Sequence, residues 1–266
     1  MQFVNDTQPQ THDMRFGGIA RLMSPKNLDV IAKSRVLIVG IGGVGSWVAE
    51  SLARTGVGHI TLVDLDDVCI TNTNRQLLAL NSTIGKPKVQ VMKERIFDIA
   101  PEIDVNAILD FFTKETAEDI LFQNFDMIID CIDSIDNKCL LIDMARSNSI
   151  PIITIGGAGG KIDPTLIRSS DLSYSSNDTL LKRVRRTLKM EWNYPRDNKT
   201  LWNVQAVYSI ERARYLNENG QLEYVPDLTN RGINCATGIG TVSWLTGSFA
   251  FTASALAIQT ILKNAR

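Results

Sequence analysis

The sequence contains no pair of cysteines with CxxC spacing. Its cysteines lie far apart, at Cys69, Cys131, Cys139 and Cys235. This spacing argues against a structural zinc site and against a disulfide scaffold, so we predict a reduced protein without zinc. The first residues, Met1 to Asp13, are polar and lack the apolar segment of a signal peptide, so we expect a cytoplasmic protein. Peripheral association with a membrane stays open.

The chain also lacks an excess of charge of either sign, since its net charge is −1. No overall field attracts nucleic acid, and binding of that kind therefore needs a local basic patch. Charged residues are absent from the whole run between Ile233 and Leu262, which exceeds the roughly 20 residues that span a bilayer. Because this run holds many Ser, Thr and Gly residues and Gln259, we favour a helix buried in the core or a subunit interface over a transmembrane helix.

A glycine-rich turn lies between two predicted strands. Val36 to Val39 is a short apolar run, typical of a strand buried on both faces of a parallel sheet. Four glycines follow, Gly40, Gly42, Gly43 and Gly45, together with a predicted helix over Val44 to Arg54. The glycines allow a close approach of backbone N–H groups to phosphate, and the helix N-terminus adds partial positive charge. A second strand ends at Asp64, where a carboxylate reaches a ribose hydroxyl, so the pattern predicts nucleotide binding.

Strands and helices continue to alternate along the chain. Further strands are predicted over Ile103–Leu109, Phe125–Asp130 and Ile150–Ile155, and shorter β segments over Lys161–Arg168 and Asn203–Ser209. This alternation predicts an α/β, Rossmann-like, doubly wound and mainly parallel sheet with helices on both faces and a mixed β extension. We interpret 1–266 as a single domain. It has a loose tail over 1–13, a nucleotide-binding core over 14–155 and a substrate-side extension over 156–266, which ends in the apolar helix.

Polar residues follow the second and fourth strands. An NAD-binding site does not need the polar cluster of Asn72, Asn74 and Arg75. The forked guanidinium of the arginine suits phosphate oxygens, and the alternative is a solvated polar loop. Lys86 and Lys88 flank a predicted helix start, from which an ammonium can reach a triphosphate. Asp130 and Asp133 suit Mg²⁺, with helix capping as the alternative, for which Asp136 is the better candidate. Asp66 and Asp67 can hold a metal-bound water or repel anions.

These segments resemble one family in their order and spacing. The segments GIGGVGS, Asp64-Leu65-Asp66, NTNRQ, GKPK and the DxxDS of Asp130 to Ser134 are similar to those of the ubiquitin-activating-enzyme-like adenylyltransferases, from about Arg15 to Leu262. The resemblance implies ATP and Mg²⁺ as cofactors. The nucleotide-binding residues that it implies are Gly40, Gly42, Gly43, Gly45, Asp64, Asp66, Asn72, Arg75 and Lys88. The catalytic residues that it implies are Arg75, Lys88, Asp133 and Arg21, with Asp133 also as the Mg²⁺ ligand.

Members of this family also use an N-terminal arginine that reaches into the site of a partner subunit, so the resemblance implies a homodimer. The family's RYxRQ signature is replaced by RFGGIAR here, which leaves Arg15 and Arg21 as candidates for that arginine.

One branch of the family matches best. Sulfur-carrier activators usually carry two CxxC pairs, whereas the segments RFGGIARL, RTGVG, NTNRQ, GGAGGKIDPT and NCATGIG are similar to a branch that modifies tRNA. This implies ATP-dependent cyclisation of the threonylcarbamoyl group on the adenosine next to the anticodon. A sulfur acceptor protein associated with a cysteine desulfurase is a second partner that the resemblance admits. The alternatives are activation of a ubiquitin-like sulfur carrier, an NAD(P)-dependent oxidoreductase and a non-catalytic nucleotide-binding module.

Two further features have open interpretations. Cys235 either relays sulfur or forms a thioester, or it is a small residue packed near the site. A helix predicted over Leu180 to Trp192 carries five basic residues, Lys182, Arg183, Arg185, Arg186 and Lys189. Such a charge run is usually a solvated face, and with a tRNA substrate it is also a local patch that can contact phosphates.

Overall fold

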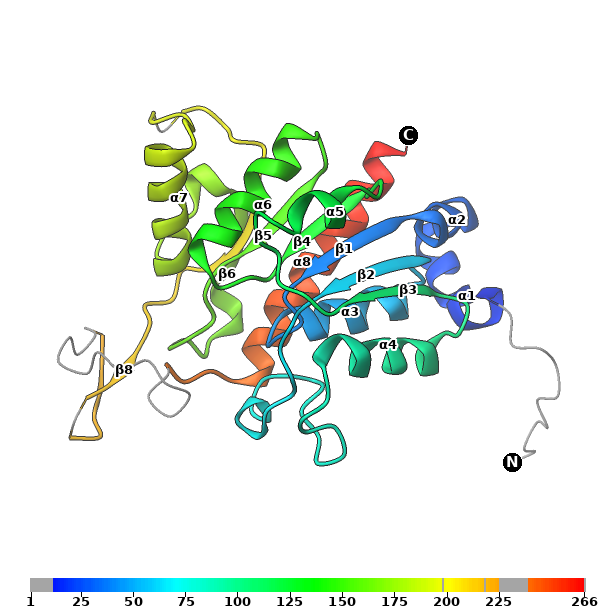
Figure 1. Ribbon diagram of the computed structural model, residues 1–266, viewed down its shortest axis with the longest axis horizontal. Coiled ribbons are helices and arrows are strands. Elements are labelled where there is room, and N and C mark those ends of the chain that lie inside the picture. The colour runs from blue at the N-terminus through cyan, green and yellow to red at the C-terminus, as the bar shows by residue number, and fades with distance from the viewer. Residues whose placement is uncertain (1–11, 198, 218, 225–238, 266) are drawn as a thin grey trace.

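The computed structural model describes residues 12–197, 199–217, 219–224 and 239–265 (Figure 1). A seven-stranded sheet lies between two layers of helices, with the strands in the order β3-β2-β1-β4-β5-β7-β6. The strands are β1 (Arg35–Val39), β2 (His59–Val63), β3 (Asp104–Ile108), β4 (Met127–Asp130), β5 (Ile152–Ile155), β6 (Ile167–Asp171) and β7 (Gln205–Ser209). Neighbouring strands are parallel except for β6, which pairs antiparallel with β7. The predicted doubly wound sheet with a mixed C-terminal side is therefore confirmed.

The central strands are buried on both faces because helices cover both. One face packs on α2 (Pro25–Lys33), α3 (Gly45–Thr55), α4 (Lys88–Ile99) and α8 (Ser243–Asn264). The other packs on α5 (Ala117–Leu121), α6 (Ile135–Ser147) and α7 (Thr179–Glu191). Alternate residues of β1 enter the two cores, since Val36 and Ile38 pack on the first face while Leu37 and Val39 pack on the second. The unbroken apolar run of β1 follows from this double coverage.

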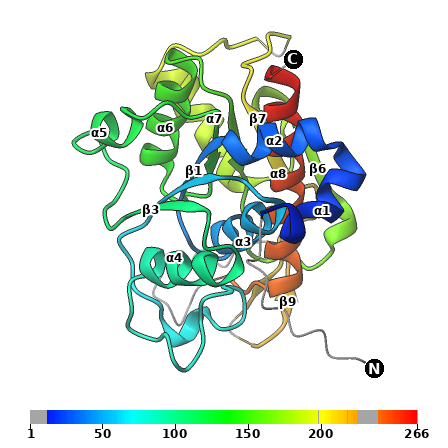
Figure 2. The same cartoon turned by 90° about the vertical axis from the view of Figure 1, so that its right-hand side faces the viewer.

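The uncharged C-terminal run forms α8 over most of its length. Leu245, Phe249, Ala253, Ala257 and Ile261 recur every four residues and are buried. They pack α8 against α3 and α2 on one face of the sheet (Figure 2). Among the described residues, α8 is the one helix long and apolar enough to cross a membrane, with 56% of its apolar window buried. The expected buried helix is present from Ser243 onward.

Four local expectations differ from the structure. Residues 14–23 form a helix, α1 (His12–Met23), together with the last two residues of the expected loose tail, and residues 1–11 of that tail lie outside the described residues. The β segment expected over Lys161–Arg168 lies later in the chain, because Pro164 begins a 3₁₀ turn and β6 then starts at Ile167. The segment after β7, for which no strand is predicted, contains a short hairpin of β8 (Tyr215–Leu216) and β9 (Leu222–Glu223). The suggestion that Asp136 caps α6 is wrong, because Ser134 is the N-cap residue and Asp136 lies in the first turn.

Candidate functional site

A cavity of about 860 Å³ opens at the carboxyl ends of the parallel strands. Its lining includes Gly40 after β1, Asp64 after β2, Cys131 to Asp133 after β4 and Gly156 to Gly159 after β5. β1 and β4 are neighbours in the sheet, although the chain visits β2 and β3 between them. Ligands of open α/β sheets bind at such a switch in strand order, because the loops on its two sides diverge.

The glycine turn is built by two close backbone contacts. Gly40 has a φ of +90°, and a Cβ there would lie 2.9 Å from the carbonyl oxygen of Cys131. At Gly45 a Cβ would lie 1.8 Å from the carbonyl oxygen of Gly40, closer than any atoms can approach. Gly42 and Gly43 line the cavity with Gly40, whereas Gly45 does not. Gly40 and Gly45 therefore allow the turn to close, and Gly40, Gly42 and Gly43 lie where a ligand can approach the backbone.

Asp64 fastens this turn to the end of β2. One carboxylate oxygen of Asp64 accepts the N–H of Ile41 at 2.6 Å, and the other accepts the N–H of Asp66 at 2.9 Å. Burial raises the pKa of the Asp64 carboxyl, and the ammonium of Lys88 opposes that rise. The carboxylate lines the cavity and has lone pairs left for a ribose hydroxyl.

Lys88 lies at the start of α4, where its side chain is buried against acids of the β2 end. Its Nζ lies 2.7 Å from a carboxylate oxygen of Asp66 and 3.8 Å from one of Asp64. The neighbouring Lys86 is exposed and does not line the cavity. Of the two lysines in GKPK, the structure therefore brings Lys88 to the site, where it can exchange a carboxylate partner for phosphate.

Arg75 is held at the cavity by its backbone. Its carbonyl oxygen accepts hydrogen bonds from Trp47 Nε1 of α3 at 3.1 Å and from Thr246 Oγ1 of α8 at 3.2 Å. Its guanidinium donates to the Thr71 carbonyl at 2.8 Å and to Asn74 Oδ1 at 3.0 Å. α3 and α8, which are far apart in sequence, thus fix the backbone position of Arg75, and the side-chain amide of Asn74 orients its guanidinium.

Asn72 also lines the cavity and has a structural task there. Its Oδ1 accepts the N–H of Cys69 at 3.0 Å and so closes the 3₁₀ turn of Ile70–Asn72. The NTNRQ segment therefore supplies a fixed turn, a guanidinium and an amide at one wall of the cavity.

The sequence model of the ThiF family matches residues 18–265. The chain belongs to the ThiF family. It is 42% identical over 253 residues to the tRNA threonylcarbamoyladenosine dehydratase of Haemophilus influenzae, covering 95% of each chain. The crystal structure of E. coli tRNA N6-threonylcarbamoyladenosine dehydratase in complex with ATP matches with a TM-score of 0.84. That match has 40% identity and covers 95% of this chain and 96% of that one. The molybdopterin-synthase adenylyltransferase of Escherichia coli is 38% identical over 129 residues, 47% of this chain and 50% of that protein.

These matches confirm the family that the glycine, NTNRQ and GKPK segments indicate. The dehydratase matches cover 95% of the chain, whereas the adenylyltransferase match covers about half of it.

The two acids of the DxxDS segment have different surroundings in this ThiF-family chain. Asp130 is fully buried, forms an ion pair with Lys138 Nζ at 3.0 Å and accepts a hydrogen bond from Thr154 Oγ1 at 2.7 Å. Burial raises the pKa of Asp130, against the pull of the Lys138 charge. Asp133 is exposed, lines the cavity and has no polar partner among the described residues. Of the two, Asp133 is therefore the one that can meet a bound ion.

The two N-terminal arginines also differ in their contacts and exposure. Arg15 donates to the carbonyl oxygen of Ile99 at 2.9 Å and lies 3.6 Å from Glu102, so it is bound within its own chain. Arg21 is exposed on the last turn of α1 and does not line the cavity of its own chain.

The three described cysteines are free. Burial raises the pKa of Cys131 and of Cys139 to about 12, so both thiols stay protonated. Cys69 is exposed at the cavity, and a hydrogen bond from Thr71 lowers its pKa. Cys235 lies outside the described residues.

Several lining residues are not among the site residues that the sequence predicted. The side-chain Oε1 of Gln76 is buried at this cavity without a hydrogen-bond partner among the described residues, and Thr246 of α8 also lines the cavity. The Gly156 to Gly159 loop also lines the cavity. Its similarity to family members could be noticed in the sequence, but its place beside the glycine turn depends on the pairing of β4 with β5.

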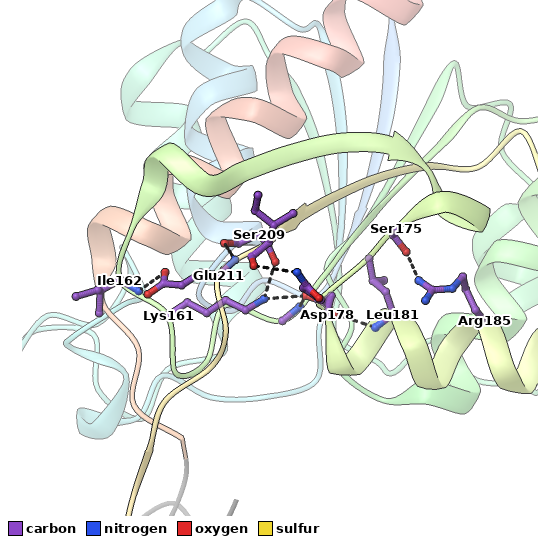
Figure 3. A network of polar contacts seen from close by, with 11 residues as sticks. Lys161, Ile162, Ser175, Asp178, Leu181, Arg185, Ser209 and Glu211 are labelled. Atoms are coloured by element: carbon purple, nitrogen blue, oxygen red, sulfur yellow. Dashed lines mark hydrogen bonds and ion pairs between the residues drawn. The ribbon is translucent and has the colours of Figure 1, made fainter. Parts of the chain in front are cut away.

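A buried polar network fixes that loop (Figure 3). Asp178, just before α7, accepts the N–H of Gly157 at 2.9 Å and Nζ of Lys161 at 3.1 Å. Its other oxygen accepts the N–H of Leu181 and so caps α7. Nζ of Lys161 also donates to the carbonyl oxygen of Ser209 at the end of β7. One carboxylate therefore joins the cavity loop to the start of the basic helix.

Proposed function

We propose that this protein dehydrates N6-threonylcarbamoyladenosine in tRNA to its cyclic form, with ATP as the activating substrate. The observation that carries the proposal is the likeness to dehydratases over 95% of the chain, combined with a switch-point cavity that holds Arg75 and Lys88. ATP fits this cavity chemically. The glycine turn exposes backbone N–H groups for phosphate, Asp64 can bind ribose, and Val63, Phe112 and Ile132 provide apolar walls for a base.

The reaction divides into two displacements. A carboxylate oxygen of the threonylcarbamoyl group attacks the α-phosphorus of ATP, the bond to pyrophosphate breaks, and an acyl-adenylate forms. A nucleophilic atom of the carbamoyl group then attacks the acyl carbon, the bond to AMP breaks, and one proton leaves. The nucleoside has lost one water, whose oxygen departs in AMP. Ring closure is intramolecular, with an effective molarity on the order of 10⁵ M or more, so no enzyme nucleophile is needed.

The chain's own task is to position the reactants and to stabilise charge. Arg75 and Lys88 face the negative charge that develops on the departing phosphates. Asp64 holds the turn by accepting the N–H of Ile41, and the glycines at positions 40 and 45 allow the close backbone approaches within the turn.

The test is incubation with ATP and threonylcarbamoylated tRNA, followed by digestion and mass analysis of the nucleosides. We expect loss of one water from the modified adenosine and one AMP for each ring formed. A parallel reaction with ubiquitin-like sulfur carriers addresses the alternative that the adenylyltransferase match favours. A carrier adenylate without cyclic nucleoside would overturn the proposal.

Mg²⁺ is part of the proposal because the cavity is rich in acids. Its lining holds the carboxylates of Asp64, Asp66, Asp67, Asp110 and Asp133 against the cations Arg75 and Lys88. A triphosphate adds more negative charge, and Mg²⁺ is commonly held by one or two carboxylates together with phosphate oxygens and water. Asp133, exposed and without a described partner, is the proposed ligand. The ion would neutralise charge on the pyrophosphate group.

Asp133→Asn should raise the Mg²⁺ concentration needed for half-maximal activity by about tenfold or more, the scale of loss when groups that support a metal are removed. Asp136→Asn is the matched control, because Asp136 is an exposed acid three residues further on, in the first turn of α6, that does not line the cavity. Titration of Mg²⁺ at fixed ATP measures both. Equal curves for Asp133→Asn and the unmodified protein would remove the role.

We also propose a soluble homodimer in which Arg21 enters the partner subunit's cavity. Arg21 is exposed and away from its own cavity, and Trp244 and Phe251 leave apolar surface exposed along α8. A subunit interface covers such surface, and an added arginine offsets the excess of acids.

Mixing Arg21→Ala chains with Asp133→Asn chains should restore about one quarter of normal activity, since half of the dimers are mixed and one of two sites in each is intact. At a low Mg²⁺ concentration, where Asp133→Asn has lost most of its activity, each variant alone should be far less active than the mixture. Light scattering gives the mass of the assembly without detergent. A monomer, or no recovery after subunit exchange, would contradict the arrangement.

Two expectations stay predictions. Cys235 is not required as a nucleophile by the proposed chemistry, and the sulfur acceptor protein remains a proposed partner without a described docking site.

A further inference from the structure

A second, smaller cavity lies on α7, away from the ATP cavity. It has a volume of about 340 Å³, and its lining residues are Lys182, Arg185, Arg186, Lys189, Met190 and Arg196. The two cavities have no lining residue in common. Five of the six side chains are cationic and none is acidic, so we call this cavity the basic groove.

The groove is built by two segments rather than by one helix face. Leu181, Val184 and Leu188 are buried and turn the opposite side of α7 into the core. Arg196 comes from the segment that follows α7 and is placed beside the helix by its neighbours. The N–H of Tyr194 donates to the carbonyl oxygen of Leu188 at 3.2 Å.

Aromatic contacts hold the segment that carries Arg196. The ring of Tyr194 packs edge-on against Trp202, with 4.9 Å between the ring centres. The guanidinium of Arg146 lies 4.8 Å from the centre of the Tyr194 ring. Nζ of Lys189 donates to the carbonyl oxygen of Arg196 at 3.4 Å. Because of these contacts, the backbone at Arg196, seven residues after Lys189, lies beside α7.

The groove gathers positive charge without a described counter-charge. None of its five cations forms an ion pair within the part of the chain that the structure describes. Arg185 is half-buried and donates to Ser175 Oγ, and burial lowers the pKa of its guanidinium against the pull of Asp178. Like charges repel at short range, so an anion with several acceptor oxygens lowers the free energy of this arrangement.

The position of Arg183 shows that the groove is not a uniformly charged face of the helix. It lies in the same turn as Lys182 and Arg185 and is exposed, but it does not line the groove. The five basic residues of α7 are therefore divided into four that converge on one cavity and one that points elsewhere.

We propose that the basic groove binds backbone phosphates of the tRNA substrate, beside the nucleotide that enters the ATP cavity. The proposal rests on the proposed function for the identity of the substrate. α7 begins at the ATP cavity, where Leu180 lines the wall and Asp178 holds Gly157. Lys189 lies nine residues further, about 13 Å along the helix axis. That distance corresponds to about four stacked nucleotides at roughly 3.4 Å each, so neighbours of the reacting adenosine reach the groove.

The carboxylate of Asp178 connects the basic groove with the ATP cavity. Because one carboxylate caps α7 and also accepts the N–H of Gly157, the helix that carries the groove and the Gly156 to Gly159 loop of the ATP cavity are bound to the same side chain. A phosphate in the groove thus sets the position of the RNA relative to ATP.

The experiment compares a triple variant, Lys182→Ala with Arg186→Ala and Arg196→Ala, with the single variant Arg183→Ala. Binding of fluorescein-labelled threonylcarbamoylated tRNA is measured by anisotropy over a series of salt concentrations. We expect the triple variant to bind at least about tenfold more weakly, with a salt slope that falls by about two units, as for two lost phosphate contacts. Arg183→Ala should change the affinity less than about twofold.

Arg196→Ala alone tests the groove without altering α7, and it should weaken tRNA binding while leaving the KM for ATP unchanged. Circular dichroism checks the fold of each variant. If Arg183→Ala weakened tRNA binding as much as Arg196→Ala, the proposal would be overturned in favour of a general charged face. Unchanged tRNA affinity in the triple variant would also overturn it.

Two controls separate other outcomes. Sedimentation with vesicles of phosphatidylserine and phosphatidylcholine that depends on Arg196, combined with tRNA binding that does not, would assign the groove to a membrane and overturn the proposal. If the unmodified protein fails to dehydrate the tRNA, the proposed function fails. The affinity comparison still decides whether the groove binds RNA.

Discussion

Gly45→Ala is expected to abolish ATP binding and to lower the melting temperature of the protein. A Cβ at this position would lie 1.8 Å from the carbonyl oxygen of Gly40, so backbone rather than a flexible side chain must move. Overpacking of this kind costs about 3 kcal/mol or more, the upper end of the usual range. For a domain of this size the loss corresponds to a melting temperature lower by about 6–12 °C.

Gly42→Ala is the matched control for this prediction. A Cβ at Gly42 would have Gln76 Nε2 as its nearest neighbour, at 3.8 Å, which is ordinary contact. Its melting temperature should stay within about 2 °C of the unmodified protein. Thermal unfolding with and without ATP and Mg²⁺ measures both effects. If Gly45→Ala melts like Gly42→Ala and is still stabilised by ATP, the described turn is incorrect.

Arg75→Ala is expected to lower turnover by about 100-fold or more at saturating ATP, the loss typical of one preorganised donor to a developing charge. The fold should be retained, because α3 and α8 hold the backbone carbonyl of Arg75 rather than its side chain. Arg75→Lys should recover only part of the activity, since an ammonium cannot form the two parallel hydrogen bonds of a guanidinium.

Lys86→Ala provides the control, because Lys86 is a cation of the GKPK segment that is exposed and does not line the cavity. Initial rates of AMP release, measured with threonylcarbamoylated tRNA, compare the variants directly. Near-normal turnover of Arg75→Ala would show that the guanidinium does not face the reacting phosphates.

The core of the fold could be predicted because its signals are local. The apolar run of β1, the glycines after it and Asp64 after β2 are adjacent in sequence and define one unit of strand, turn, helix and strand. The same holds for α8, whose uncharged run indicated burial, and its residues every four positions are indeed buried. Each of these features depends on backbone geometry and hydrophobic period, which a sequence shows directly.

Other positions could not be assigned from the sequence because their surroundings come from distant segments. Asp130 and Asp133 are three residues apart, yet Lys138 and Thr154 bury the first while the second stays at the cavity. Arg15 differs from Arg21 because Ile99 and Glu102, far along the chain, bind it.

The sequence by itself therefore determined the doubly wound sheet, its glycine turn, the buried C-terminal helix and the family of the chain. The resemblance implied Asp133, and the tertiary structure shows that Asp133 lines the cavity while Asp130 is buried. Only the tertiary structure decided which arginine is left outside its own site and that Arg196 rather than Arg183 joins the basic groove. The physical reason is that periodicity shows which side of an element faces the core. The partner of a single side chain depends instead on which remote strand or helix packs beside it.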